Sequence, residues 1–388
     1  MTEILPDLAL VSPTGMQTLH MEPGLTASHK ARVVFECFLS HGYVLAEPSL
    51  LQPASVFLDL SGEDIRSRLF VTHDAEGHEL CLRPEYTIPV CRDYLSSGHA
   101  GTQAAYAYCG PVFRVRAGES GEFIQSGVEN FGRTDFEAAD ADLFALCLQA
   151  ANDTGLKIKI GDTALLSTLL NQLDLSPFWL RRIKRGLAAG KPFADIFNLP
   201  ARGAAQDHSG VLKALEGVDR KGARALVEDL LSIAGISTVG GRSVGEIADR
   251  FLEQSSMKSD SGLLPEKRAI LERFLSIAGH PDSASIKLRV LAKEAKLDLS
   301  DALDAFDMRN GFIAAHGIAL EPIEFSTAFA RNLDYYTGFV FEARHANASR
   351  PSIGGGRYDR LLKALGAPHD IPAVGAALWI DRLNGVTA

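Results

Sequence analysis

The spacing of hydrophobic residues changes twice along this chain. Between residues 28 and 160, runs that alternate between apolar and polar residues, as half-buried strands do, are interrupted by segments with helical spacing. The alternation returns from residue 321. Between these parts the spacing is mainly helical, at residues 171–188, 207–218, 222–234, 243–254, 266–277 and, in pieces, 283–316. We therefore expect one core made from residues 1–163 and 319–388 and divided by a helical insertion at 164–318, which has no strand-like run.

The first part of the core begins with a helix and a hairpin. Residues 28–41 have amphipathic helical spacing, and Gly42 is typical of a helix end. Strand-like runs at 69–72 and 79–82 flank a turn at 74–77. This pattern predicts a short antiparallel pair after the first helix.

A strand-to-helix junction follows the hairpin. Pro84 disfavours the helical conformation for Arg83, whereas Pro89 suits the first turn of a helix. Glu85 and Thr87 lie between the two prolines. Because such junctions often carry ligand-binding groups, both are candidate site residues.

Two longer strands are predicted at 103–116 and 123–132, before a strong helix at 136–152. In the second of these strands Gln125, Gly127 and Glu129 occupy alternate positions, so they share one face of the sheet. A face with these residues does not suit an apolar core. It predicts the wall of a polar cavity, with a solvent-exposed face as the alternative.

The last part of the chain predicts three more strands around a cluster of glycines. Strands are expected at 323–330, 336–344 and 373–378, helices at 357–365 and from 379 onward, and a close backbone approach at the glycines 354–356. Together with the first part, this order predicts an α+β fold: a mostly antiparallel sheet flanked by helices.

Residues 330–342, with the sequence ARNLDYYTGFVFE, contain a turn that leads into an alternating apolar run. Neighbouring residues on a strand point to opposite faces, so one of Tyr335 and Tyr336 would line a cavity while the other packs. The alternative is a hairpin rim whose tyrosines both belong to the core.

Composition excludes several classes of protein. The chain has 388 residues and a net charge of −9, which argues against a general nucleic-acid binder. Five cysteines without a CxxC spacing predict reduced thiols in a cytoplasmic protein, with neither a disulfide framework nor a zinc site. No signal peptide and no apolar run long enough for a membrane span are present in the sequence.

Familiar catalytic motifs are absent or incomplete. Residues 186–191 are one residue shorter than a phosphate-binding loop, and Pro192 stands in place of its Ser or Thr. The basic run at 181–185 fits a solvated helix face, with a partner surface as the alternative. No HExxH or GxSxG motif occurs, so neither a metal nor a cofactor is expected.

Several segments together resemble one family. The segment YCGPVFRVR followed by QSGVENFG resembles motif 2 of class II aminoacyl-tRNA synthetases, and AVGAALWIDRL resembles motif 3, with its arginine at Arg382. LRPEYT, RNLDYYTGFVFE and GGGRYDRL resemble the histidyl-tRNA synthetase branch. Pro48 is similar to the motif 1 proline at that family's dimer interface. The likeness covers roughly residues 28–160 and 320–388.

The resemblance implies a pocket for L-histidine. By motif position, Glu85, Thr87 and Gln125 would bind the ammonium group. Arg114, with Arg331 as a second candidate, would bind the carboxylate through charge-assisted hydrogen bonds. Glu129 and either Tyr335 or Tyr336 would contact the imidazole nitrogens.

The departures from the synthetase pattern concern ATP and tRNA. Arg116 replaces the motif 2 glutamate, and Trp379 replaces a motif 3 glycine and would fill the adenine space. The loop after motif 2 is short and acidic, which would repel phosphates. The chain ends six residues after Arg382, so no anticodon-binding domain is expected. The sequence thus predicts a degenerate ATP site at Arg116, Trp379 and Arg382, and no binding of tRNA.

A family with these properties is known: the regulatory subunits of ATP phosphoribosyltransferase. The resemblance implies a non-catalytic chain that dimerises and completes the short-form catalytic subunit in the first step of histidine biosynthesis. It also implies feedback regulation by histidine. The alternatives are a catalytic, synthetase-like enzyme and a histidine sensor with another partner.

Overall fold

The structure described is a computed structural model of the chain. The fold is built around one large sheet. The described residues are 27–61, 63–116, 118, 120–188, 191, 193–197, 222, 263–329 and 335–383. Within them, the large sheet has nine strands in the order β1-β5-β6-β12-β11-β10-β7-β9-β8. All neighbouring strands are antiparallel except the pairs β1–β5 and β7–β9. The prediction of an α+β fold with a mostly antiparallel sheet is confirmed.

The strands of this sheet come from both ends of the chain. They are β1 (Val44–Leu45), β5 (Ala104–Phe113), β6 (Glu122–Phe131), β7 (Leu156–Asp162), β8 (Ala278–Gly279), β9 (Ile323–Ser326), β10 (Phe339–His345), β11 (Ile353–Arg357) and β12 (Ala373–Trp379). Strands β12 and β11 lie between β6 and β10, so the last part of the chain forms the middle of the sheet.

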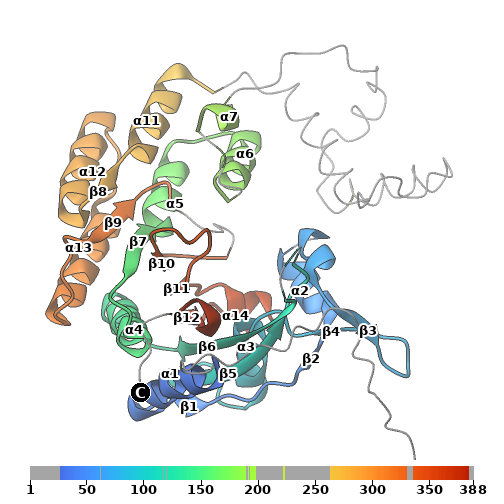
Figure 1. Ribbon diagram of the computed structural model, residues 1–388. Helices are drawn as coiled ribbons and strands as arrows, with labels where there is room; N and C mark the ends of the chain where they lie inside the picture. Colours follow the sequence, from blue (N-terminus) through green and yellow to red (C-terminus); the bar gives the residue numbers. More distant parts are fainter. Residues whose placement is uncertain are drawn as a thin grey trace, which may run out of the picture.

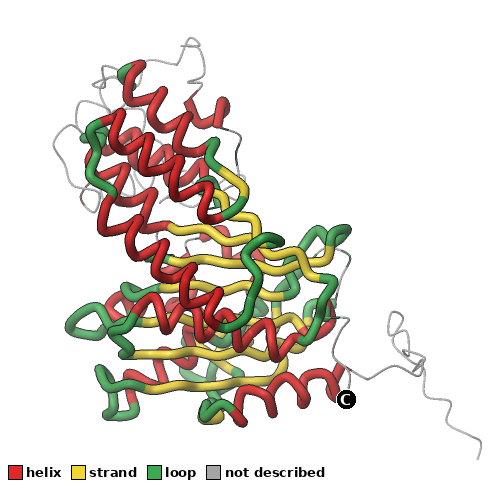
Figure 2. The backbone as a smooth tube through the Cα atoms, turned by 90° about the vertical axis from the view of Figure 1, so that its left-hand side faces the viewer, coloured by secondary structure: helices red, strands yellow, loops and turns green. Residues whose placement is uncertain are grey.

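Helices lie on both faces of the sheet (Figures 1 and 2). On one face, α1 (Ala27–Ser40) and α4 (Phe136–Ala151) pack over β5, β6 and β12, with Phe38 and Phe144 fully buried between them and the strands. On the other face, α3 (Thr87–Ser96) and α14 (Leu361–Ala364) bury a second cluster that contains Tyr94, Tyr108 and Tyr358. This second face is where the candidate site lies.

A small sheet flanks the second face and contains the predicted hairpin. Its order is β2-β4-β3, with β3 (Val71–His73) and β4 (Glu79–Leu82) where the hairpin was expected. Three neighbouring elements were not predicted: β2 (Leu51–Pro53), α2 (Ala54–Ser61) and the 3-10 helix η1 (Glu63–Arg68). They are too short to show a clear hydrophobic period, so the sequence pattern did not reveal them.

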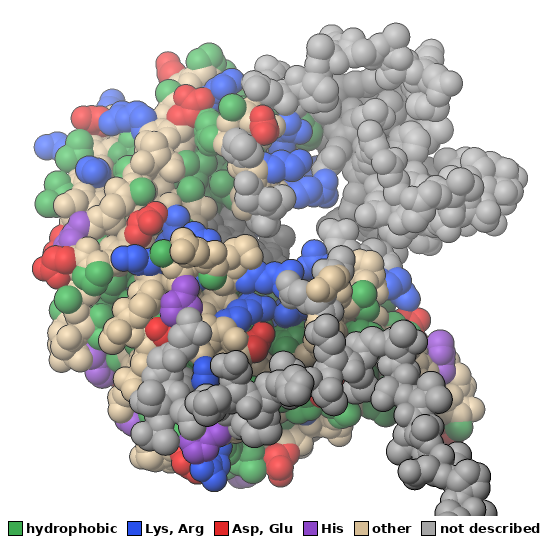
Figure 3. All heavy atoms as spheres, viewed as in Figure 1, with side chains coloured by type: hydrophobic (Ala, Val, Ile, Leu, Met, Phe, Trp, Pro, Cys, Tyr) green, Lys and Arg blue, Asp and Glu red, His purple; other side chains and the backbone are tan. Residues whose placement is uncertain are grey.

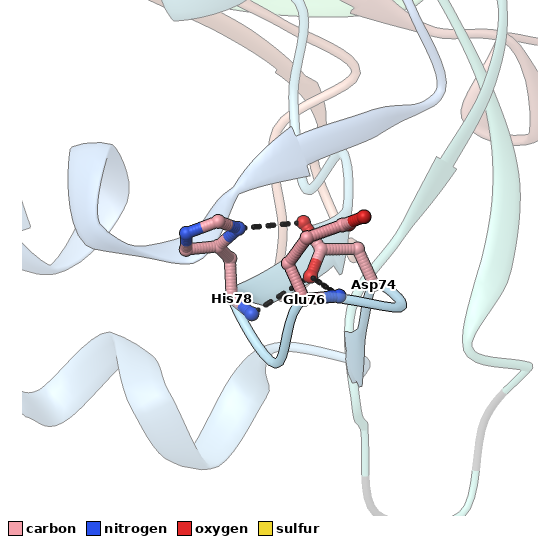
Figure 4. A group of neighbouring side chains, drawn as sticks. All are labelled: Asp74, Glu76 and His78. Carbon is pink, nitrogen blue, oxygen red and sulfur yellow. Dashed lines mark hydrogen bonds and ion pairs between the residues drawn. The ribbon is translucent and has the colours of Figure 1, made fainter.

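The turn of this hairpin holds a cluster of possible metal ligands (Figure 4). Ligand atoms of Asp74, Glu76 and His78 all lie within 4.8 Å of one another. The Asp74 carboxylate, however, accepts hydrogen bonds from the backbone N–H groups of Glu76 and His78, at 3.0 and 2.8 Å. Although desolvation opposes it, the hydrogen bonds from His78 hold the pKa of Asp74 below its ordinary value. These contacts explain the cluster as a stabilised turn.

In the region predicted as a helical insertion, the described residues form helices and one strand. The helices are α5 (Thr163–Gln172), α6 (Pro177–Ala188), α7 (Phe193–Phe197), α11 (Pro265–Leu275), α12 (Pro281–Ala295) and α13 (Ser300–Ala315). Figure 1 shows α11, α12 and α13 beside β8 and β9, at one end of the large sheet. The segments predicted at 207–218 and 243–254, and all but the first residue of 222–234, lie outside the described residues.

Two predictions for this region are wrong. Residues 171–188 do not form one helix, because Asp174 adopts a left-handed φ of +44° and α6 starts afresh at Pro177. The region also contains a strand, β8, which pairs with β9 and so joins the large sheet. A strand of two residues is too short for alternation to show in the sequence. The division of the chain into core and insertion stays a prediction.

Three predictions near the end of the chain are also corrected. The strand expected from Tyr336 begins only at Phe339, so Tyr335 and Tyr336 lie in the turn before it. The helix expected at 357–365 is reduced to α14, because β11 continues to Arg357. The chain after β12 forms a 3-10 turn, η2 (Ile380–Arg382), in place of an α-helix.

The glycine cluster lies inside β11, where the backbones approach closely as predicted. A Cβ atom at Gly355 would stand 2.5 Å from the Cβ of Ala376 and from the carbonyl oxygen of Gly375 on β12. No side chain fits this space without displacing β12. Because the glycines have no side chains, no side-chain atoms project from this part of the sheet, which lies beside the candidate site.

A buried charge network connects α4, β7, β11 and α13. Arg357 on β11 donates to Asp140 of α4 at 2.9 Å through Nε and lies 2.7 Å from the same oxygen through Nη2. Arg309 of α13 reaches Asp140 at 3.5 Å and forms a closer ion pair with Asp162 of β7. All four side chains are at most 6% exposed. The sequence analysis did not identify this network.

Candidate functional site

A cavity of about 310 Å³ opens on the second face of the sheet. Its walls come from the start of α3, from β6, β11 and β12, and from the turn before β10. Six predicted histidine-binding residues line it: Glu85, Thr87, Arg114, Gln125, Tyr335 and Tyr336. The fold thus brings together residues that are up to 251 positions apart in sequence, from Glu85 to Tyr336.

Glu85 is held by the start of helix α3. Its carboxylate accepts hydrogen bonds from the backbone N–H groups of Thr87 at 2.6 Å and Ile88 at 2.9 Å. These N–H groups have no partner within the helix, so a carboxylate at this position satisfies them. Burial raises the pKa of Glu85, against the opposing effects of the Ile88 N–H and of Arg114. The result is a carboxyl group with a fixed orientation in the cavity wall.

Arg114 supplies a cation to the same cavity. Its Nε donates to the carbonyl oxygen of Pro84 at 2.7 Å, which fixes the guanidinium next to Glu85. Burial lowers the pKa of Arg114 to about 10; Glu85 opposes this shift, and the cations of Arg116, Arg382 and Arg68 add to it. Arg114 remains charged at neutral pH, and three further guanidinium groups contribute to the positive potential around it.

Gln125 on β6 is 2% exposed and faces Trp379 across the β6–β12 pairing. Both side chains line the cavity. In the described part of the chain, the Oε1 atom of Gln125 and the Nε1 atom of Trp379 are buried without a hydrogen-bond partner. Buried polar atoms are normally paired, so this pair is suited to receiving a polar ligand.

Glu129 lies on the same face of β6 as Gln125 but is not among the residues that line the cavity. Its carboxylate accepts hydrogen bonds from the hydroxyl groups of Tyr358 and, at 3.4 Å, Tyr108. Tyr358, which was not predicted as a site residue, lines the cavity. Its hydroxyl group connects the cavity wall to the Glu129 carboxyl group behind it. Burial raises the pKa of Glu129 to about 8, although the hydrogen bond from Tyr358 opposes the shift.

The raised pKa of Glu129 predicts a pH-dependent stability. Folded Glu129 keeps its proton up to about pH 8, whereas the unfolded residue releases it near pH 4.5, so folding takes up a proton between these values. We expect the stability of the native protein relative to its Glu129→Gln variant to decrease as pH rises from 4.5 to 8, by up to about 1.4 kcal/mol per pH unit. Urea unfolding of both proteins at pH 5, 6, 7 and 8 measures this difference.

The exposed Glu36 of α1 provides the matched control for this experiment. Its carboxylate pairs with Arg32 at 3.7 Å on the helix surface. The Glu36→Gln variant should therefore differ from the native protein by nearly the same amount at each pH. A constant or rising difference for Glu129→Gln would contradict the assignment of a buried, protonated carboxyl group.

The two tyrosines before β10 lie side by side in the cavity wall. Their rings are nearly perpendicular, with centroids 4.8 Å apart, and Tyr335 also packs 5.5 Å from Tyr358. The prediction that only one of them would face a cavity is wrong, because both belong to a turn and the alternation of a strand does not apply. Arg331 lies outside the described residues.

The predicted remnants of an ATP site surround the outer side of the cavity. Arg116 packs on the ring of Phe123, with its guanidinium carbon 3.7 Å from the ring centroid. Arg382 lies over the ring of Trp379 at 5.1 Å and donates to the carbonyl oxygen of Pro351 at 2.8 Å. Of these three predicted residues, only Trp379 lines the cavity among the described residues. Arg68 of η1, which was not predicted, lines it as well.

Comparisons with known proteins reveal the family. The chain matches the family model described as Histidyl-tRNA synthetase over residues 22–240 and 222–383. An ATP phosphoribosyltransferase regulatory subunit from Mesorhizobium japonicum is 39% identical over 361 residues, which cover 91% of this chain and 96% of that protein. The chain belongs to the ATP phosphoribosyltransferase regulatory subunit family. A second member of the family, from Brucella anthropi, is 38% identical over 350 residues, 88% of this chain and 92% of the relative.

Solved structures share the fold of this chain. An ATP phosphoribosyltransferase regulatory subunit/histidyl-tRNA synthetase from Bacillus halodurans superposes with a TM-score of 0.69 at 22% identity, over 98% of this chain and 84% of that one. A histidyl-tRNA synthetase from Nostoc sp. PCC 7120 superposes with a TM-score of 0.62 at 17% identity. The superposition covers 97% of this chain and 75% of the synthetase chain. These likenesses show the class II synthetase fold. The names of the family members confirm the prediction of a regulatory relative of the synthetases in place of a catalytic one.

One prediction from the hydropathy of the sequence concerns membranes. Within the described ranges, no helix combines the length and the apolar character that crossing a membrane requires.

Pro48, expected at a dimer interface, is itself buried in the chain, and its carbonyl oxygen accepts a hydrogen bond from Arg83 at 2.7 Å. Any interface at this position would therefore involve the residues on either side of Pro48.

Proposed function

We propose that this chain is the non-catalytic subunit that completes ATP phosphoribosyltransferase in the first step of histidine biosynthesis. In this proposal its partner is a short-form catalytic subunit. The observation that carries it is the identity of 39% to a protein named as the regulatory subunit, over nearly the full length of both chains. The free thiols of all five cysteines suit a cytoplasmic complex.

We further propose that the cavity binds L-histidine and that this binding regulates the complex. Glu85, Thr87 and Gln125 present acceptors for an ammonium group, and Arg114 presents a cation for a carboxylate. Tyr335, Tyr336 and Tyr358 offer hydroxyl groups and ring faces to an imidazole, and Glu129 would act on it through Tyr358. Histidine would regulate the complex by binding one of its two states more tightly than the other.

The outer side of the cavity supports a regulatory role over an adenylating one. Trp379 lines the cavity where the motif 3 resemblance would require a glycine, and Arg116 covers one face of Phe123. An indole in this position leaves less space for an adenine ring. We therefore propose that the chain neither activates histidine with ATP nor binds tRNA.

The test uses a short-form catalytic subunit from the same organism. We expect phosphoribosyl transfer to ATP to be several-fold faster with this chain present than without it, and L-histidine to reduce the rate of the mixture. Unchanged activity with and without the chain would contradict the proposal and favour a sensor with another partner. Histidine-dependent exchange between ATP and pyrophosphate by the purified chain would favour the catalytic alternative.

We also propose that the chain self-associates through the sheet edge next to Pro48. Strand β1 is one of the two edge strands of the described sheet, and Val44 and Leu45 on it are 61% and 45% exposed. Leu50 and Leu51, on the other side of Pro48, are also exposed. An apolar edge strand of this kind is normally covered in a stable protein.

A charge placed on this edge should weaken the dimer. We expect Val44→Lys to raise the dissociation constant of the dimer by about tenfold or more, because association would bury an unpaired ammonium group. Sedimentation velocity over a range of protein concentrations measures this. Val290→Lys, on the exposed side of α12, is the control and should leave the association unchanged. An unchanged association of Val44→Lys would place the interface elsewhere.

A further inference from the structure

Trp379 and Gln125 form a polar pair on one side of the cavity. They are direct neighbours in the antiparallel pairing of β12 with β6, so their side chains lie on the same face of the sheet. The buried indole N–H of Trp379 is a donor, and the buried Oε1 of Gln125 is an acceptor. Neither has a partner among the described residues. A ligand that satisfies both must present an acceptor and a donor next to each other.

Several arginine side chains contribute to the electrostatic surroundings of this pair. The guanidinium groups of Arg68, Arg116 and Arg382 are close enough to Arg114 to act on its charge. Arg382 also lies over the Trp379 ring. Figure 3 shows Lys and Arg side chains gathered near the middle of the face drawn. Glu85 accepts hydrogen bonds at the start of α3, next to Arg114, and the buried carboxyl group of Glu129 lies behind Tyr358. An anionic group of a ligand is therefore favoured at the Trp379 side.

Resting on the proposed function, we infer that Trp379 recognises the carboxylate of the bound amino acid. Its indole N–H donates to a carboxylate oxygen, the Arg114 guanidinium supplies the counter-charge, and Gln125 Oε1 accepts from the neighbouring ammonium group. An α-amino acid carries these two groups on one carbon atom, so it presents an acceptor and a donor side by side. Trp379 thus determines specificity, in addition to occupying the space of an adenine ring.

This role has a consequence for ligand selection. A site that hydrogen-bonds a charged group rejects ligands without it, because its own buried polar atoms are then left unpaired. The cavity should therefore accept free L-histidine and reject derivatives whose carboxylate is reduced, esterified or amidated. L-histidinol, in which a CH2OH group replaces the carboxylate, tests this directly, because it keeps the ammonium group and the imidazole.

The chain offers a matched control, because it contains only two tryptophans. The indole N–H of Trp179 on α6 is also buried and has no partner within the described ranges, but its ring stacks on Phe197 and does not line the cavity. We expect Trp379→Phe to weaken binding of L-histidine by about 10- to 100-fold and to leave the affinity for L-histidinol unchanged. Trp179→Phe should change neither affinity. Isothermal titration of the full-length proteins with both ligands measures all six values.

A second measurement does not depend on the folding of the Trp379 variant. In the Trp179→Phe protein, the remaining indole N–H resonance belongs to Trp379, and L-histidine should shift it downfield whereas L-histidinol should not. Equal effects of Trp379→Phe on both ligands, or an indole resonance that does not respond to L-histidine, would overturn the inference while leaving a histidine pocket intact. If the native protein binds no L-histidine, the proposed ligand fails, and this inference fails with it.

Discussion

Asp140→Ala is expected to destabilise the chain by about 3–5 kcal/mol, because it leaves two buried arginines without their shared partner. Arg357 contacts the Asp140 carboxylate at 2.7 and 2.9 Å, and Arg309 contacts it at 3.5 Å. Asp140 is 1% exposed, so water cannot replace its charge. Arg309 keeps Asp162, whereas Arg357 keeps an ion pair with the half-buried Asp359 and a hydrogen bond to the carbonyl oxygen of Phe136. Urea unfolding monitored by circular dichroism measures the loss.

Asp142 provides a control from the same helix. Two residues along α4, it pairs with Arg133 at 2.7 Å and with His316 at 2.8 Å, but its side chain is 44% exposed. Exposed ion pairs contribute about 0–1 kcal/mol, so Asp142→Ala should cost no more than this. Similar losses for the two variants would show that the buried network does not stabilise the fold more than surface pairs do.

The buried charge network also affects the shape of the cavity, because Arg357 directly precedes Tyr358 in the chain. Arg357 donates to Asp359 at 2.9 Å, and Asp359 accepts a hydrogen bond from the Ala373 N–H at the start of β12. These bonds fix the backbone on both sides of Tyr358, whose hydroxyl reaches Glu129. An Asp140→Ala protein that still folds should therefore bind L-histidine more weakly than the native protein does.

The second large effect is expected for the cation of the cavity. Arg114→Met should weaken L-histidine binding by at least about 30-fold, from the 2–5 kcal/mol that follows when one partner of a buried, hydrogen-bonded charge pair is removed. Methionine keeps most of the length and apolar contact of the side chain, so the loss reports the charge. Isothermal titration measures the affinity, and inhibition of the assembled complex by histidine should weaken in parallel.

Arg116→Met is the matched control, because it removes an arginine two residues away. Arg116 packs on Phe123 and does not line the cavity among the described residues. Its removal should change histidine affinity by no more than about threefold, since a partly exposed charge beyond direct contact is strongly screened. Equal losses for the two variants would show that the general positive potential, and not a contact of Arg114, binds the carboxylate.

Local patterns in the sequence were sufficient to predict the long helices and strands. The helices at 27–40 and 136–151 and the strands at 104–113 and 122–131 have clear hydrophobic periods, and the structure places them close to the predicted bounds. The glycines of β11 also signalled a close backbone approach. Periodicity did not identify β2, α2 or β8, because such short elements depend on a pairing partner more than on their own sequence.

The candidate site was predictable in part. The family resemblance pointed to four binding residues: Glu85, Thr87, Arg114 and Gln125. The structure places all four around one cavity. Their role as histidine contacts stays a prediction. Tyr358 was missed although it lies in the quoted segment GGGRYDRL, because no local pattern indicates that its hydroxyl meets Glu129, which is 229 positions earlier.

By itself, then, the sequence determined the order of the elements, the alternating face of β6 and the family. Only the tertiary structure decided which groups meet: Asp140 with Arg357, which is 217 positions later, Tyr358 with Glu129, and Trp379 with Gln125. The physical reason is that periodicity reports the face on which a residue lies and not the partner it contacts. That partner depends on strand order and register, which are properties of the whole sheet.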